Sequence, residues 1–464
     1  MISSQRFTVF RRAATMAATV AAVAAPALGA QQPSPPSLGQ PVRLSLGDAA
    51  RLAARQSNGV QTAEQRVAEA VARVRQSRAA LLPELSANAL QSGRTFNSVT
   101  FGISLPSAPG QPPLFNPEGE VLGPVNTLDL RGRVQADLLD PAALARVRTA
   151  QTAVEAARAD IGNAGDLAAS QAAVAYIRVQ RGNAQLSARL ADSVLARELL
   201  NIAQSQLEAG VGVALDVTRA QSQLAGIRAQ LISARNERDR AQLDLRRALN
   251  LALDTPVELS DSLTSVVPED LALDEATATA RALRDRPDLR AAEEQLRAAQ
   301  QTVRAIRAER LPSISAFGDE GTIGKSGSNR LLPTYTYGVQ LSLPIFDGFR
   351  REGRIQEQEA VTRELDVRRR DLEQQASIDV RGGLLDLAAA REAIGASRER
   401  LRLAEQEVEQ ARERFRAGVA GNADVVTAAF TLNAARSQYV DVLTALQQAR
   451  VSLARAEGAV TQLR

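Results

Sequence analysis

One segment of the sequence occurs twice, and this duplication limits the fold more than any other feature. Residues 207–224 read LEAGVGVALDVTRAQSQL, and residues 415–432 read FRAGVAGNADVVTAAFTL. Gly210 in the first copy matches Gly418 in the second, and the match continues beyond both segments at the same spacing. Each copy has a glycine between two stretches rich in helix-forming residues. The repeated unit is therefore predicted to be a helical hairpin, present twice.

The distribution of proline predicts how long these helices are. No proline occurs between Pro141 and Pro256, and none follows Pro344. Because proline breaks helix interiors, the two proline-free tracts are expected to be almost wholly helical. Aromatic residues make up only 3% of the chain and Trp is absent, so large buried side chains are scarce. This composition is typical of long helices that pack through small residues.

The tract lengths suggest one architecture built twice: a long helix beside two shorter helices stacked end to end. Long helices are expected at 142–209 and 351–417. A helix of this length extends for about 100 Å. The shorter helices are expected at 48–82 and 216–250 in the first half, and at 275–311 and 424–460 in the second. The chain thus reads as repeat 1 (44–250), a linker (251–273) and repeat 2 (274–464).

Two segments interrupt the helical pattern and are predicted to be β-hairpins, at about 84–139 and 313–346. Both follow a Leu-Pro pair and contain runs that alternate apolar and polar residues, which is typical of half-buried strands. Aromatic residues are concentrated here, and the candidates for a membrane-interface girdle are Phe96, Phe101, Tyr335, Tyr337 and Phe346. The alternative is a pair of hairpins packed on a soluble core.

Two hairpins give four strands, and the known membrane barrels start at about eight. An open sheet edge cannot be exposed to lipid, so membrane-embedded hairpins in this chain require several copies. Two copies would give eight strands with a filled interior, and three would give twelve strands around a pore.

The first residues are expected to direct export. Residues 1–30 combine an early basic region, an Ala/Val-rich stretch and small residues, as a secretory signal peptide does, with cleavage after Ala27 or Ala30. The alternative is a membrane anchor. Residues 31–43 are expected to be a flexible segment.

The chain has no Cys and no His, so thiolate metal sites, disulfides and histidine bases are excluded.

Arg and Glu are interleaved along the expected helices, which predicts solvated faces and interhelical ion pairs. The net charge is +4, and three of those charges lie in the expected signal peptide. Nucleic acid is therefore not expected as a partner.

Taken in order, these motifs resemble the TolC-type outer-membrane factors, from about Leu44 to Val460. The matching sequences are LSLGDAARLA (44–53), LALDEATATA (271–280), RPDLRAAEEQLRAA (286–299), LSLPIFDG (341–348) and the two tips. The resemblance implies a mostly helical fold: coiled-coil helices form an α-barrel, and a homotrimer shares one 12-stranded transmembrane β-barrel. It places the linker 251–273 in a belt around the helices.

The resemblance also implies a function and partners. The protein would be an outer-membrane channel that extends into the periplasm and passively conducts substrates in tripartite efflux or type I secretion. Its partners would be a periplasmic adaptor (membrane fusion) protein, an inner-membrane pump of the RND or ABC type, and outer-membrane lipid. The cargo, whether drug, metal or polypeptide, does not follow from the sequence.

By the same resemblance, the helical tips form the periplasmic gate, with Asp216, Asp424 and Thr427 as its candidate residues. The alternative for each Asp is an N-cap of the following helix. Phe415 and Ala420 replace the aromatic and basic gate partners of some relatives, which suggests a differently latched gate. Gly210, Val211, Gly418 and Val419 are the candidate turn and adaptor-docking residues.

Other classes of function fit the sequence less well. No Gly-rich phosphate loop or nucleophile motif is present, so no enzyme, cofactor or metal site is expected. The remaining alternative is a secreted periplasmic coiled-coil adaptor, or a structural protein without a pore.

Overall fold

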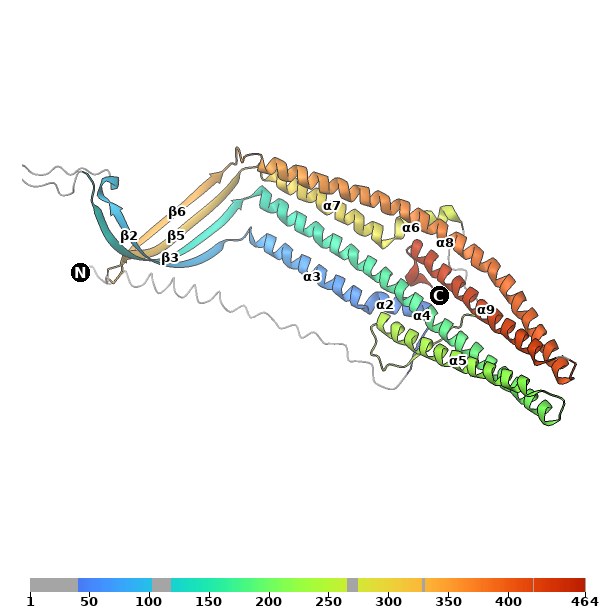
Figure 1. Ribbon diagram of the computed structural model, residues 1–464. Coiled ribbons are helices and arrows are strands. Elements are labelled where there is room, and N and C mark those ends of the chain that lie inside the picture. The colour runs from blue at the N-terminus through green and yellow to red at the C-terminus, as the bar shows by residue number, and fades with distance from the viewer. Residues whose placement is uncertain (1–40, 102–117, 265–273, 328–329, 420, 464) are drawn as a thin grey trace, which may run out of the picture. The chain divides into compact units, whose positions relative to one another are not determined.

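The computed structural model describes residues 41–101, 118–264, 274–327, 330–419 and 421–463. The predicted signal peptide and Ala420 lie outside these residues. From Val42 onward the chain forms one compact unit. It is mostly helical. A small antiparallel sheet lies at one end of the long helices, and the two turns that connect the long helices to the helices that follow them lie at the other (Figure 1).

Two long helical hairpins dominate the structure. In the first, α4 (Pro141–Glu208, 68 residues) is followed by α5 (Ala214–Ala248, 35 residues). In the second, α8 (Arg350–Arg416, 67 residues) is followed by α9 (Asn422–Ala456, 35 residues). Asp140 caps the start of α4 by accepting hydrogen bonds from two backbone N–H groups, at 2.9 and 3.0 Å. Pro141 occupies the first helical turn, where it removes no helical hydrogen bond.

The shorter helices that precede each sheet hairpin are divided, which corrects the expectation of one helix each at 48–82 and 275–311. They form α2 (Leu46–Gln56), α3 (Asn58–Ala79), α6 (Glu275–Asp285) and α7 (Pro287–Ala308). Ser57 is extended and caps α3 through its side chain. Arg286 is extended because it precedes Pro287, whose ring disfavours a helical residue before it.

The sheet contains four antiparallel strands in the order β2-β3-β5-β6. These are β2 (Glu84–Asn97), β3 (Val121–Leu139), β5 (Ser313–Lys325) and β6 (Leu332–Ser342). Two hairpins are thus joined side by side through β3 and β5. Strands β2 and β6 form the edges and have no further partner in the described part of the chain, so each presents a row of unpaired backbone groups.

The two faces of this sheet differ in polarity. Directly opposed residues in antiparallel strands lie on the same face, so the register defines rows across the sheet. One row contains Leu85, Val134, Gly318 and Tyr337, and the adjacent row on the other face contains Ser86, Arg133, Asp319 and Thr336. On the polar face, Arg131 pairs with Asp319 and Asp129 and donates to the hydroxyl of Thr334 at 3.3 Å. The apolar face remains exposed, as at Leu85 and Tyr337.

A short parallel pair of strands holds the start of the compact unit against α4. Strand β1 (Val42–Leu44) pairs with β4 (Val257–Leu259). The buried Tyr176 hydroxyl of α4 donates to the Leu44 carbonyl at 2.9 Å. The end of the segment predicted to be flexible, 31–43, is therefore ordered at Val42 and Arg43, because these residues hydrogen-bond within a sheet. This region also contains the largest apolar cluster, which brings together α2, the middle of α4 and the end of α5.

Small side chains set the distance between the helices of each hairpin. A Cβ added at Gly182 of α4 would lie 3.0 Å from the Arg238 Cα of α5, and one at Gly383 of α8 would lie 3.2 Å from the Leu453 Cα of α9. Each long helix thus comes close to its partner at a glycine. No helix in the described ranges is both long and apolar enough to cross a bilayer.

Asp166 lies in α4, near Arg286 and Asp288 at the start of α7 and Arg455 of α9. Burial raises its pKa to about 6 from an ordinary value of 3.8; Arg455 and Arg286 oppose this shift, whereas Asp288 adds to it. Arg286 itself is paired with Asp288 at 2.7 Å and with Asp379 at 2.8 Å, so it is already neutralised. Ionised Asp166 is therefore poorly compensated in the folded chain.

This imbalance predicts a pH-dependent effect of Asp166→Asn. Because the folded pKa lies above the unfolded one, the folded chain loses stability as pH rises from about 4 to about 6, by up to about 3 kcal/mol. We expect the variant to melt at a higher temperature than wild type above pH 6, with the difference disappearing near pH 4. Asp386→Asn, an exposed change on α8, is the matched control. Equal melting shifts for both variants at pH 7.5 would contradict this assignment.

Candidate functional site

The turn at the end of each long helix has the same hydrogen-bonded geometry. Gly210 and Gly418 adopt φ values of 75° and 70°, the left-handed region that favours glycine. Val211 N–H donates to the Gln206 carbonyl at 3.0 Å, and Val419 N–H donates to the Arg414 carbonyl at 3.0 Å. These bonds satisfy carbonyls left free at the helix end. The two valines remain 80% and 71% exposed, so each tip presents an apolar side chain.

The N-cap alternative for Asp216 and Asp424 is wrong. Helices α5 and α9 begin two residues earlier than expected, with Val213 and Gly421 as N-caps that make no side-chain cap bond. Each Asp therefore occupies the first helical turn, where a negative charge is favoured by the helix dipole. Asp216 is half-buried and lies 3.7 Å from Arg219, whereas Asp424 is exposed.

Thr427 lies one turn beyond Asp424 on α9. Its hydroxyl donates to the Ala423 carbonyl of the same helix at 2.9 Å, so its polar atom is engaged locally. The structure brings the two tips side by side, because the Asn422 side chain of α9 donates to the Asp216 carbonyl of α5 at 2.8 Å. The first helical turns of both repeats are thereby linked within one chain.

Phe415 lies at an apolar contact between the two hairpins. It is only 2% exposed and packs in a cluster that draws residues from α4, α5, α8 and α9. Leu199 and Val425 are the most buried members of this cluster, at 0% each. The Gln206 side chain of α4 also donates to the Phe415 carbonyl at 2.7 Å. Phe415 thus latches one hairpin to the other by packing.

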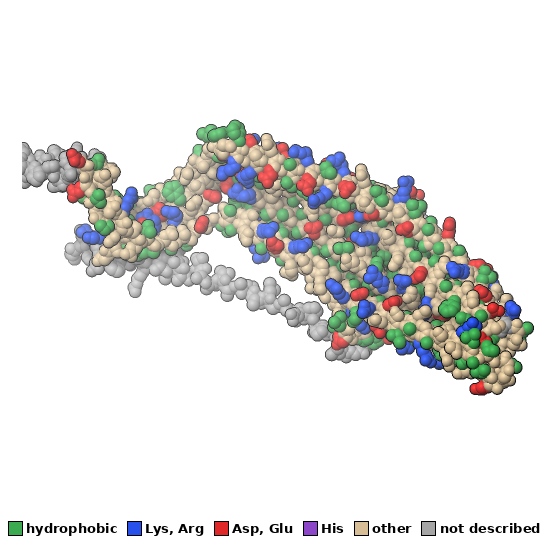
Figure 2. All heavy atoms as spheres, viewed as in Figure 1, with side chains coloured by type: hydrophobic (Ala, Val, Ile, Leu, Met, Phe, Trp, Pro, Cys, Tyr) green, Lys and Arg blue, Asp and Glu red, His purple; other side chains and the backbone are tan. Residues whose placement is uncertain are grey.

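We call the line of contact between the two hairpins the seam. Two groups of ion pairs extend it from Phe415 away from the tips. Glu198 of α4 pairs with Arg412 at 3.2 Å and with Arg416 at 2.5 Å, both on α8. Asp192 of α4 is 4% exposed and pairs with Arg436 of α9 at 2.7 Å. Elsewhere on the helical surface, charges of both signs are interspersed (Figure 2). The spacing of Arg412 and Arg416 by four residues was the available sequence signal, but it did not identify their partner.

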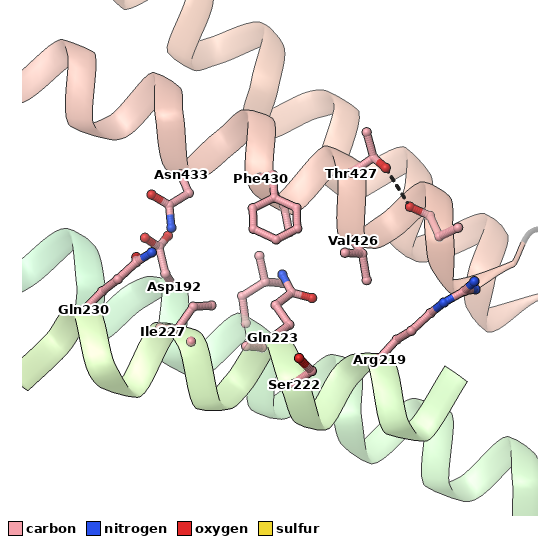
Figure 3. Close-up of a pocket in the computed structure, with 15 residues that line it drawn as sticks. Asp192, Arg219, Ser222, Gln223, Ile227, Gln230, Val426, Thr427, Phe430 and Asn433 are labelled. Atoms are coloured by element: carbon pink, nitrogen blue, oxygen red, sulfur yellow. Dashed lines mark hydrogen bonds between the residues drawn. The ribbon is translucent and has the colours of Figure 1, made fainter. Parts of the chain in front are cut away.

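A cavity of about 510 Å³ lies beside the seam, between α5 and α9, with α4 as its floor (Figure 3). Its apolar wall includes Leu195, Ile227 and Phe430. Gln223 points toward Phe430 from the opposite helix, and its Oε1 atom is buried without a hydrogen-bond partner. Sequence reasoning missed this cavity because it depends on how the two hairpins are placed side by side.

The predicted girdle residues lie at different levels of the sheet. Tyr335 and Tyr337 are 74% and 79% exposed on the apolar face of β6, with ring centroids 6.1 Å apart. Phe346 lies beyond the other end of β6, beside Phe349 at 5.4 Å. Phe96 lies near the end of β2, with the Arg94 guanidinium 5.1 Å from its ring centre. Phe101 ends a short 3-10 helix (Ser98–Phe101).

Comparison with known proteins identifies the family of this architecture. The profile of the outer membrane efflux protein family matches residues 124–251 and 279–459. The toluene efflux pump outer membrane protein TtgF of Pseudomonas putida is 33% identical over 196 residues, which cover 39% of this chain and 38% of TtgF. The alkaline protease secretion protein AprF of Pseudomonas aeruginosa is 31% identical over 164 residues, covering 33% of this chain and 32% of AprF.

Among solved structures, the outer membrane channel CmeC of Campylobacter jejuni has the same fold. The two structures align with a TM-score of 0.73 at 18% sequence identity, over 89% of this chain and 85% of CmeC. The mostly helical fold with a small antiparallel sheet, expected from the sequence, is thereby confirmed.

Proposed function

This chain belongs to the outer membrane efflux protein family, and from that membership we propose that it forms the outer-membrane channel of a tripartite export system. The observation that carries the proposal is the four-stranded sheet, which has an exposed apolar face, a polar face and two open edges. A sheet with this polarity suits a barrel wall, with lipid outside and water inside.

Three copies of the chain would complete the barrel. Four strands cannot close, and edges without partners are not tolerated in lipid. Pairing β2 of one chain with β6 of the next would give twelve strands and a pore. About ten residues separate the tyrosines of β6 from Phe346, which at a typical strand tilt spans a band of about 25 Å. This matches the apolar height of outer-membrane barrels.

The helices would continue the barrel as a tunnel into the periplasm. Helices α4 and α8 contain 68 and 67 residues, so each extends for about 100 Å. In this arrangement repeat 1 (44–250) and repeat 2 (274–464) each supply one hairpin to the wall, and 251–273 belongs to a belt around it. A homotrimer would have six such hairpins.

We assign the gate to the tips, with Asp216, Asp424 and Thr427 near the narrowest point. Three exposed Asp424 carboxylates around a narrow pore would favour cations. We expect Asp424→Asn to lower the cation-to-anion permeability ratio by at least about twofold and to change the conductance of the resting channel. Asp254→Asn removes the same charge from an exposed site far from the tips and should leave both unchanged. Equal selectivity in the two variants would remove Asp424 from the gate.

The exposed tips are also the proposed docking surface for a periplasmic adaptor protein, through Gly210, Val211, Gly418 and Val419. The adaptor would connect the channel to an inner-membrane pump of the RND or ABC type. The names of the relatives TtgF and AprF describe toluene efflux and protease secretion, so efflux and type I secretion both remain candidate roles.

Planar-bilayer recording of the purified protein tests the proposal. We expect heat-modifiable trimers from outer-membrane fractions to produce discrete conductance steps, because a twelve-stranded barrel encloses a pore. Folded protein that adds no conductance and stays out of the membrane would instead favour a periplasmic adaptor or structural coiled coil.

A further inference from the structure

The cavity between α5 and α9 has the size and lining of a small-molecule site. Its volume of about 510 Å³ falls in the range of about 300–1,000 Å³ that is typical of ligand pockets. Ile227 of α5 supplies a buried wall, and Phe430 of α9 is 60% exposed and leaves its ring available for stacking. The lining is therefore mixed: apolar side chains and an aromatic ring lie beside polar side chains such as Gln223 and Asn433.

One buried polar atom of the cavity lining has no hydrogen-bond partner. The Oε1 atom of Gln223 is buried and makes no hydrogen bond, and Figure 3 shows its side chain between the helices, facing Phe430. A buried acceptor left unpaired costs free energy, which a ligand donor would recover. Once the Gln223 side chain turns its amide oxygen into the cavity, a ligand that brings one N–H group can satisfy this acceptor.

The charges around the cavity argue for an uncharged ligand. The Asp192 carboxylate, on the α4 side, is already paired with Arg189 at 3.1 Å and with Arg436 at 2.7 Å. It therefore has little attraction left for a ligand cation. The Arg219 guanidinium lies 3.7 Å from the Asp216 carboxylate, which offsets its charge. The cavity therefore has no clear excess of positive or negative charge.

We propose that this cavity binds a neutral, flat aromatic molecule carrying one N–H donor, which stacks on Phe430 and donates to Gln223. Such a ligand touches both hairpins at once. Because it binds the arrangement in which α5 and α9 lie at their present separation, it stabilises that arrangement against any that moves them. If the chain forms the proposed channel, the site gives small aromatic molecules control over the position of its tips.

N-phenyl-1-naphthylamine is a suitable probe, because it is neutral and aromatic and has one N–H group and about 17 non-hydrogen atoms. With the full-length mature protein in lipid nanodiscs, equilibrium dialysis is expected to give saturable binding at one molecule per chain. The expected Kd is of the order of 10–100 µM. Phe430→Ala should weaken binding about tenfold and Gln223→Leu about fivefold.

Gly226→Leu provides a variant that fills the cavity. Gly226 lines the cavity, and a Cβ there meets no atom within 4 Å, so the substitution should keep the fold while abolishing saturable binding. Gly395→Leu on α8 is the matched control, because a Cβ at that exposed glycine also meets nothing and the residue is not part of the cavity lining. The probe methylated at nitrogen should bind wild type about fivefold more weakly than the parent probe does. The Gln223→Leu variant should bind both probes with the same affinity, because it has no acceptor for the N–H group.

Equal saturable binding to the Gly226→Leu and Gly395→Leu proteins would overturn the site, since the probe would then be bound elsewhere. Equal affinity of wild type for the parent and methylated probes would overturn the role of Gln223. Conductance recorded from the same preparations separates this inference from the proposed function. A conducting trimer without saturable binding contradicts the site alone, and binding without conductance contradicts the channel alone.

Discussion

Arginine in place of Val339 is expected to prevent the protein from entering membranes. Val339 is 69% exposed on the apolar face of β6, between the tyrosine pair and Phe346. An arginine on the lipid face of a barrel costs about 2–4 kcal/mol near the midplane, and a trimer would incur that cost three times. We expect the fraction of heat-modifiable trimer in outer-membrane vesicles to fall by at least about tenfold.

The adjacent residue provides the control. Gln340 lies on the opposite, polar face of the same strand, because successive side chains alternate between faces. Gln340→Arg introduces the same side chain one position away and should leave the yield of inserted trimer within about twofold of wild type. Equal insertion of the two variants would show that the apolar face of this sheet does not meet lipid.

Alanine in place of Phe415 is expected to separate the two hairpins at their tips. Removing a buried phenylalanine side chain costs about 3–5 kcal/mol. Phe415 is 2% exposed and contacts α4, α5 and α9. Most of the lost free energy therefore destabilises the state in which the two hairpins are packed together. A loss of about 3 kcal/mol changes a two-state population roughly 100-fold. In bilayers, the variant channel should therefore conduct more and open more often than wild type.

Phe430→Ala is the matched control for this measurement. It removes the same side chain from the same tip region, but Phe430 is 60% exposed and lies outside the apolar cluster. We expect its conductance without added ligand to equal that of wild type. If Phe415→Ala also leaves conductance and open time unchanged while the trimer stays intact, packing at Phe415 does not hold the tips together.

The repeated architecture was predictable because its signals are local. Gly210 and Gly418 mark helix ends by their freedom to adopt positive φ, and the structure has both in that conformation. Asp140 and Pro141 mark the start of α4 as a cap and a first-turn proline. The strands follow from alternation of apolar and polar residues, which depends only on neighbours in the sequence.

Other features escaped prediction for reasons that can be named. The helix break at Arg286 was signalled by Pro287, but helix-forming residues continue on both sides of this proline and conceal the break. The capping role assigned to Asp216 failed because α5 starts at Ala214, and helix boundaries are uncertain by two or more residues when read from sequence. The seam formed by Phe415, Glu198 and Asp192 depends on contacts between residues about 200 positions apart, which no local pattern encodes.

The central claim is that the sheet is completed by other copies of the same chain, and disulfide cross-linking tests it most directly. The chain has no Cys, so two introduced cysteines report only on each other. One would replace Ser86, Asn88 or Ser92 on the edge strand β2, and the other Thr334, Thr336 or Gln340 on the edge strand β6. All six positions lie on the polar face.

Neighbouring edge strands bring opposed Cβ atoms to about 4.5–5.5 Å, close to what a disulfide requires. Among the nine pairings, those that match the register are expected to give a ladder of covalent species that ends at the trimer, and single-cysteine variants should give none. Folded protein that stays monomeric in all nine pairings, or a ladder that ends at the dimer, would contradict a barrel shared by three chains.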